Sequence, residues 1–261
     1  MIHDHQFPSI ALLYLKMLRL RTPDASVLRK ALAVVADLVD VANIAIADDG
    51  VTLQAMDSSH VCLVSLRILP EYFDLIDVGH PATIGIKLSS FIRMLTCVEG
   101  PTTFTIGDDD AFRVACDSAF FALRTLDIEQ ETMAVPDISS DVVIDIDSIV
   151  FQRLVKDLGA FGDVATIRTA PGSAMISTTG DIGDATCVLP GERTAHIATS
   201  MTSSYAIRYL ASFAKAASVA PTVNIGMMPD MPLVLTYAFP HGSLSFYLAP
   251  KIDDDDIDDA L

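Results

Sequence analysis

The chain has 261 residues, of which 51% are hydrophobic, a mean hydropathy of +0.44 and a formal net charge of −17 at pH 7. This length suits one large domain or two domains of about 110–130 residues, each able to bury a core. Charged residues interrupt every apolar run before the roughly 18–20 residues that span a bilayer, so we expect no membrane partner. The four cysteines have no paired spacing, which is typical of reduced core thiols in an intracellular protein.

The first 16 residues precede the earliest regular pattern in the sequence. Ile10–Leu15 is apolar but too short for the hydrophobic region of a signal peptide, and His3, Asp4 and His5 do not form a cationic start. We therefore expect a disordered or loosely packed extension. A second methionine, Met17, raises the hypothesis that translation begins there.

Four stretches of the chain combine apolar residues at helical spacing with a serine at or next to the start. In the first stretch Leu28, Leu32 and Val35 fall on one stripe, so we expect that face to be buried. A serine hydroxyl can accept hydrogen bonds from the free N–H groups of a first helical turn, so we expect serine caps. The predicted helices and their serines are Ser26–Asp40 with Ser26, Ser89–Cys97 with Ser89, Ser148–Gly159 with Ser148, and Ser203–Ser218 with Ser203.

These four helices carry seven of the 17 basic residues, although the chain has 34 acidic residues in total. An acidic protein that keeps its cations on matching helices can meet a polyanion on one surface and repel it elsewhere. The alternative is that the cations only solvate exposed helix faces. The seven residues are Arg29, Lys30, Arg93, Arg153, Lys156, Arg208 and Lys215.

An internal repeat organises the rest of the chain. Asp40–Ile44 aligns with Asp163–Ile167 at an offset of 123 residues, and strand-like alternation follows in both halves. Asp49-Gly50 and Pro171-Gly172 sit where tight hairpin turns belong. We therefore predict an α+β fold of two similar domains, each with two helices on one face of antiparallel sheet. The expected parts are an extension over 1–16, a first domain over 17–125, a connector over 126–137, a second domain over 138–252 and an acidic tail over 253–261.

Four sequence blocks resemble the eukaryotic sliding clamp family, proliferating cell nuclear antigen. They are VTLQAMDSSHVCLVSL over 51–66, LDIEQ over 126–130, IRYLASFAKA over 207–216 and LSFYLAPKIDD over 244–254, within a resemblance that spans roughly Met17 to Asp256. The resemblance implies a DNA-clamp fold in which three identical chains form a ring around duplex DNA, with helices lining the hole. It also implies a processivity factor for DNA polymerase, without an enzymatic activity, that recruits replication and repair proteins.

The same resemblance assigns two sets of site residues. The seven helical cations would face the DNA without reading its sequence, and Ala36, Thr96 and Ala160 are neutral where the family commonly has a basic residue, which implies a thinner cationic lining. Partners such as the polymerase, the clamp loader, a flap endonuclease and a ligase would insert a peptide with aliphatic and aromatic anchors into an apolar pocket. Its residues would be Met56, His60, Val61, Leu63, Val135, Pro136, Pro232, Tyr247, Ala249, Pro250 and Ile252.

The chain departs from the family pattern at several points. The connector is about two residues longer than usual, and the stretch Gly107–Ala119 is shorter. The strand Ala119–Thr125 should pair with Gly183–Leu189 of the next chain. Pro171-Gly172 occupies the turn where many relatives carry a modified lysine, so we expect no signalling through that site. The shortened region leaves open an alternative, that the chain is one subunit of a heterotrimeric checkpoint-type clamp.

No residue pattern supports catalysis, a metal or a cofactor. Asp57-Ser58-Ser59-His60 contains the residue types of a hydrolase triad, but neighbours on one turn cannot converge as such a site requires. The six histidines have no ligand-like spacing outside the N-terminal tail, and no glycine loop has the context of a phosphate site. We expect a binding protein of the nucleus, or of the replication compartment if the chain is viral.

Overall fold

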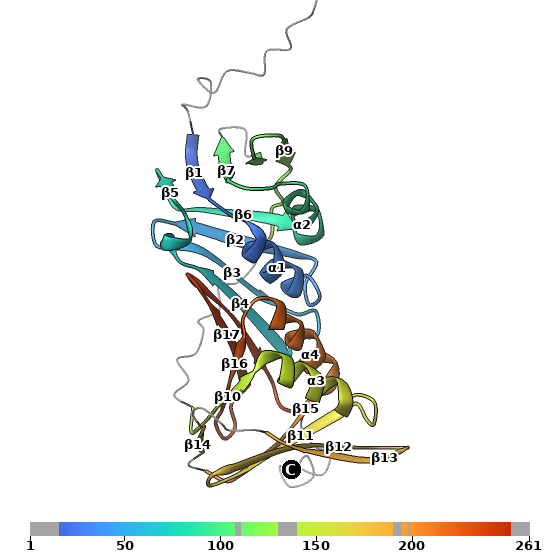
Figure 1. Cartoon of the computed structure of the whole chain (residues 1–261). Helices are drawn as coiled ribbons and strands as arrows, with labels where there is room; N and C mark the ends of the chain where they lie inside the picture. The colour runs from blue at the N-terminus through green and yellow to red at the C-terminus, as the bar shows by residue number, and fades with distance from the viewer. Residues whose placement is uncertain (1–15, 108–110, 130–139, 190–194, 198, 252–261) are drawn as a thin grey trace, which may run out of the picture.

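A computed structural model describes residues 16–107, 111–129, 140–189, 195–197 and 199–251 of the chain. The expected N-terminal extension and acidic tail, and most of the connector, lie outside these residues. Figure 1 shows the helices following one another along one side of the molecule, with the strands forming curved sheets beside them.

The described part of the first half contains two α-helices and nine strands. In chain order these are β1 (Lys16–Thr22), α1 (Ser26–Val35), β2 (Val41–Ala47), β3 (Gly50–Met56), β4 (Cys62–Ile68), β5 (Leu75–Val78), β6 (Ala82–Lys87), α2 (Leu88–Thr96), β7 (Thr102–Gly107), β8 (Phe112–Ala115) and β9 (Phe120–Leu123), with a short 3₁₀ helix η2 (Pro70–Tyr72) after β4.

The second half repeats this order. Its elements are β10 (Val142–Asp147), α3 (Ser148–Leu158), β11 (Val164–Ala170), β12 (Ser173–Gly180), β13 (Gly183–Val188), β14 (Ala195–Ile197), β15 (Met201–Ala206), α4 (Ile207–Phe213), the 3₁₀ helix η3 (Ala214–Ser218), β16 (Thr222–Met227), β17 (Leu233–Phe239) and β18 (Gly242–Leu248).

The strand pairing confirms the predicted pair of similar α+β domains. Every pairing within the first half has a counterpart in the second: for example, β1 pairs with β5 and β7 as β10 pairs with β14 and β16. All of these pairs are antiparallel. The strands form sheets in the orders β5-β1-β7-β8-β9, β14-β10-β16-β17-β18-β4-β3-β2-β6 and β13-β12-β11-β15.

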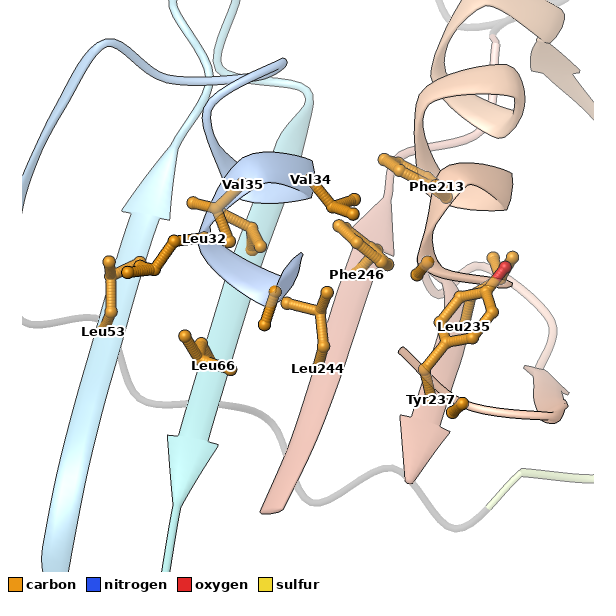
Figure 2. Close-up of a cluster of buried hydrophobic side chains, with 14 of the residues drawn as sticks. Leu32, Val34, Val35, Leu53, Leu66, Phe213, Leu235, Tyr237, Leu244 and Phe246 are labelled. Atoms are coloured by element: carbon orange, nitrogen blue, oxygen red, sulfur yellow. The ribbon is translucent and has the colours of Figure 1, made fainter. Parts of the chain in front are cut away.

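The nine-stranded sheet belongs to both halves, because β18 pairs with β4. Its register runs from Gly242 opposite Ile68 to Leu248 opposite Cys62. The side chains on the helix-covered face of this sheet form a continuous core with α1 and α4, in which Val34 of α1 lies near Phe213 and Phe246 (Figure 2). Phe213 stacks on Phe246 with a centroid distance of 4.3 Å. The two halves are therefore joined by backbone hydrogen bonds and by shared apolar packing.

The fourth predicted helix starts too early. Ser203 and Ser204 belong to strand β15, where they lie opposite Ile167 and Thr166 of β11, and the Ser204 hydroxyl is 3.0 Å from that of Thr166. The helix begins only at Ile207, because pairing with β11 holds the preceding residues extended. The first predicted helix also extends too far, since α1 ends at Val35 and not at Asp40.

The predicted serine caps are wrong. The Asp24 carboxylate accepts hydrogen bonds from the Ser26 N–H at 2.8 Å and the Ser26 hydroxyl at 2.7 Å, and these bonds lower the pKa of Asp24. Asp147 caps α3 by accepting from the N–H groups of Ile149 and Val150. The aspartates before α1 and α3 have the reach for these bonds, whereas Ser148 lies inside α3 and is buried. Within the described residues, helices α2 and α4 have no side-chain bond at their N-caps, Lys87 and Ala206.

Both predicted hairpins are present, but only one turn lies where it was predicted. Ala170 pairs with Ser173 around Pro171-Gly172, as predicted. Ala47 pairs with Gly50 around Asp48-Asp49, so the first turn lies one residue earlier than predicted and Gly50 begins β3. Gly50 has a φ of 121°, and a Cβ atom there would lie 2.1 Å from the carbonyl oxygen of Ile68, so only glycine fits.

The expectation of core thiols holds for one cysteine only. Cys62 is buried, Cys97 is exposed, and Cys116 and Cys187 are half-buried.

Candidate functional site

The helices form one layer along the molecule. Helix α1 packs against α2, α3 packs against α4 and η3, and α1 contacts η3 across the boundary between the halves. The amide of Gln152 donates a hydrogen bond of 3.1 Å to the carbonyl of Ala214, which fixes α3 against η3. We call the solvent-exposed side of α1, α2, α3, α4 and η3 the helical face.

The helical face is cationic in an otherwise acidic protein. The bounds of its five helices contain the seven predicted basic residues and one acidic residue, Asp157. Arg29 is half-buried, and the other six cations are exposed. Arg153 and Lys156 are three residues apart on α3, so they project to the same side. The structure thus places all seven predicted residues on this layer.

Two of these cations have partners within the chain. The Lys215 ammonium lies 2.7 Å from Asp37 Oδ2, and their side chains are 57% and 34% exposed. This ion pair links the second half to the turn that follows α1. The Arg208 guanidinium lies 5.0 Å from the centre of the Tyr209 ring, within cation–π range.

The opposite side of the nine-stranded sheet, which we call the outer face, carries an apolar row. Met56 lies opposite Leu63, Leu63 opposite Tyr247, and Tyr247 opposite Val234. Directly opposed residues point to the same side of a sheet. Their sequence neighbours Cys62, Leu248 and Leu233 are buried among the core residues, so the row faces away from the helices.

This row forms the floor of the predicted peptide pocket. Met56, Tyr247 and Val234 are half-buried, and Leu63 is buried between its neighbours. The next row on the same face is polar, with Gln54, Ser65, Ser245 and Thr236, so the apolar surface ends there. The sequence-based set did not include Val234, although the buried positions Leu233 and Leu235 on either side of it indicate that it points outward.

Two segments border the row. On one side the turn between β3 and β4 carries His60, which is exposed and has a φ of 58°, and Val61. Next to this turn, at the same end of the sheet, Ala249 and Pro250 follow β18, and the Ala249 N–H donates a hydrogen bond of 2.9 Å to the Val61 carbonyl. Pro232 is half-buried at the start of β17. Of the remaining predicted pocket residues, Val135, Pro136 and Ile252 lie outside the described residues. We call the row and these borders the partner pocket.

The start of the connector crosses the outer face as well. The Leu126 N–H donates a 2.7 Å hydrogen bond to the Gly85 carbonyl, and the Asn43 amide donates one of 3.0 Å to the Ile128 carbonyl. A Cβ atom on Gly85 would lie 2.3 Å from the Leu126 carbonyl oxygen, so glycine allows this approach. The connector therefore leaves the first half on the face that carries the partner pocket.

Asp57 organises the turn that borders the pocket and is 6% exposed. Its carboxylate accepts hydrogen bonds from the N–H groups of Ser59, Val61 and Cys62 at 2.8–3.1 Å and from the Tyr209 hydroxyl at 2.7 Å. Burial alone would raise the pKa of Asp57, but the bond from Tyr209 and the backbone bonds together lower it. The carboxylate thus has a structural role that sequence reasoning missed.

The ends of two sheets are open. Among the residues that the structure describes, strand β9 pairs only with β8 and strand β13 only with β12. Phe120 of β9 is 64% exposed, and Val188 of β13 is 68% exposed. The exposed Arg124 follows β9 and the exposed Asp117 precedes it, whereas the exposed Asp181 and Asp184 lie at β13.

Within the described residues, no group of three or more histidine, cysteine or acidic side chains is placed to hold a metal ion. Among the same residues, no helix has the length and apolarity to cross a membrane.

The chain is similar to known proteins over nearly its full length. Residues 17–147 match the family described as "Proliferating cell nuclear antigen, N-terminal domain", and residues 134–252 match the corresponding C-terminal domain. The "Probable DNA polymerase sliding clamp 2" of Paramecium bursaria Chlorella virus 1 is 37% identical, over 96% of this chain and 97% of that protein. Proliferating cell nuclear antigen of Chaetomium thermophilum is 30% identical, over 92% and 100%. The crystal structure of the Entamoeba histolytica protein of that name superposes with a TM-score of 0.84, at 27% identity, covering 91% of this chain and all of that one.

Proposed function

This chain belongs to the proliferating cell nuclear antigen family of DNA sliding clamps, which are non-enzymatic processivity factors, and we propose that three copies of it close into a ring around duplex DNA. The observation that carries the proposal is the helical face, where seven cations and one acidic residue occupy the helices of a protein with a net charge of −17. Exposed cations on helices suit phosphate contacts that are weak and independent of sequence. The acidic remainder would repel DNA, so the ring would hold it only inside.

Two edges of the same chain support a ring of identical subunits. Among the described residues, β9 and β13 each have an unpaired side and an exposed apolar residue, Phe120 and Val188. An unpaired edge with apolar side chains is a surface for pairing with another chain. Because the two edges differ, contact between them is head-to-tail and closes into a ring when the rotation fits. The presence of two different open edges on one chain favours a homotrimer over a heterotrimeric checkpoint-type clamp.

The native mass of the purified full chain tests this assembly. Across a dilution series in native mass spectrometry, we expect a species of three chain masses. Phe120→Asp should shift the mass toward the monomer, because it puts a charge on the unpaired edge of β9. A wild-type chain that stays monomeric when concentrated would contradict the homotrimer and favour the checkpoint-type alternative.

We propose that the ring recruits partner proteins through the partner pocket. Its methionine, aliphatic and tyrosine side chains form an adaptable apolar surface, and the residues after β18 offer backbone groups to an extended peptide. We assign to it peptides of the polymerase, the clamp loader, a flap endonuclease and a ligase, acting in the nucleus or at a viral replication site.

Calorimetry with a synthetic peptide that carries one aliphatic and two aromatic anchors tests the pocket. Tyr247→Ala removes the centre of the apolar row, so we expect at least a tenfold loss of affinity, in line with loss of an interface hot spot of about 2 kcal/mol. Thr236→Ala, in the neighbouring polar row, is the control and should leave the affinity unchanged. An unchanged affinity in the Tyr247 variant would mean that the peptide binds elsewhere.

A further inference from the structure

The turn from Asp57 to Val61 forms one border of the partner pocket. Ser58, Ser59 and His60 are exposed, and His60 has the left-handed φ of 58°, which is uncommon for a residue other than glycine. A turn of this kind keeps one conformation only when its surroundings fix it.

The Asp57 carboxylate supplies that fixation from inside the turn. Oδ1 accepts the N–H groups of Val61 and Cys62 at 2.9 and 2.8 Å, and Oδ2 accepts the N–H of Ser59 at 3.1 Å. These bonds define the shape of the turn. They do not define where the turn lies relative to the second half of the molecule.

A side-chain link to the second half is the Tyr209 hydroxyl, which donates to Asp57 Oδ2 at 2.7 Å and comes from α4, 152 residues away in sequence. Tyr209 is 8% exposed, so this charge-assisted bond is shielded from water.

The second border of the pocket, the segment that follows β18, is hydrogen-bonded to this turn and to the residues just before α4. The Ala249 N–H donates to the Val61 carbonyl, and the Lys251 N–H donates to the Ser204 carbonyl at 2.8 Å, shortly before α4 begins. Both borders of the pocket thus converge on the segment 204–209. Within the described part of the chain, the Asp57–Tyr209 bond is the one side-chain hydrogen bond between the turn and α4.

We propose that the Asp57–Tyr209 hydrogen bond is a positioning contact for the partner pocket, which holds the His60–Val61 border in the place that a bound peptide requires. The inference rests on the proposed peptide-binding function. In this proposal, neither the Asp57 nor the Tyr209 side chain contacts the bound peptide. Without this bond the His60–Val61 border is mobile. Peptide binding must then order the border, and the lost conformational entropy lowers the affinity.

The decisive variant is Tyr209→Phe, which removes the hydroxyl and keeps the ring beneath Arg208. In calorimetry with the full chain and the synthetic anchor peptide, we expect Kd to rise about threefold to tenfold, the range of a net hydrogen bond. Tyr237→Phe is the matched control, because Tyr237 is also fully buried but its hydroxyl makes no hydrogen bond within the described residues. Its Kd should stay that of the wild type.

A double-variant cycle separates positioning from general stability. Asp57→Asn should weaken binding alone, and adding Tyr209→Phe to it should weaken binding by less than the product of the two single effects, because both act through one bond. Amide hydrogen exchange should be faster at Val61 and Cys62 in Tyr209→Phe, with the native mass unchanged.

Additive effects, or a Kd within twofold of the wild type in Tyr209→Phe, would overturn the proposal if Tyr247→Ala still loses binding. If Tyr247→Ala also retains binding, the pocket itself is misplaced, and the positioning role fails with it.

Discussion

The helical face and the partner pocket lie on opposite sides of the same nine-stranded sheet and are built in different ways. The helical face presents long cations, six of them exposed, and its described ion pair with Asp37 is at the surface. The pocket has half-buried apolar side chains, and hydrogen bonds such as Asp57–Tyr209 and Val61–Ala249 fix its borders. Mobile charge suits a polyanion that slides past, whereas a fixed apolar surface suits a peptide that must stay.

The largest effect should come from the core that supports both surfaces. Phe246 is fully buried, stacks on Phe213 at 4.3 Å and lies on the strand that joins the halves. Phe246→Ala should lower the free energy of unfolding by about 3–5 kcal/mol, measured by denaturant unfolding at fixed protein concentration.

Phe161, which is 37% exposed, offers the matched control. Phe161→Ala should cost far less stability, since it removes less buried surface. Equal losses in the two variants would contradict the assignment of a shared core at Phe246.

The next effect separates the two surfaces. Arg153→Glu with Lys156→Glu should weaken retention on closed circular DNA and polymerase stimulation, and should make the slope of log affinity against log salt shallower by about 2, one for each lost phosphate contact. Peptide binding should be unchanged, because α3 is on the other side of the sheet. Arg67→Glu reverses an exposed charge on the outer face and serves as the control. Unchanged retention in the double variant would remove α3 from the DNA-facing surface.

Local patterns in the sequence predicted much of this architecture. The alternation in Val51–Ala55 and the helical stripe of Leu28, Leu32 and Val35 depend on neighbours a few residues away, and the structure confirms both. Turn residues predicted two hairpins for the same reason, one in its place and one a single residue too late. The resemblance to sliding clamps supplied the pocket residues, which are scattered over both halves and share no local pattern.

Features that depend on distant partners could not be read from local patterns. Ser203 and Ser204 fit a helix start by type, but pairing with β11 makes them a strand. Asp57 looked like part of a triad, whereas its main partner, Tyr209, lies on another element in the other half. The fusion of the two halves through β4 and β18 likewise follows from tertiary packing and not from propensity.

The smallest effect concerns a contact within the helical face that the charge count alone does not reveal. Lys215 is one of the seven cations, but its ammonium lies 2.7 Å from Asp37, so a DNA phosphate must compete with that carboxylate. An exposed ion pair contributes about 0.2–1 kcal/mol, so Asp37→Asn should raise DNA affinity by up to about fivefold at low salt. The gain should shrink as salt rises, because screening weakens both interactions. Asp157→Asn removes the same charge from α3 and is the control, measured in the same DNA titration. A larger gain for Asp37→Asn identifies release of Lys215 as the cause, whereas equal gains would mean that only the total charge of the helical face matters.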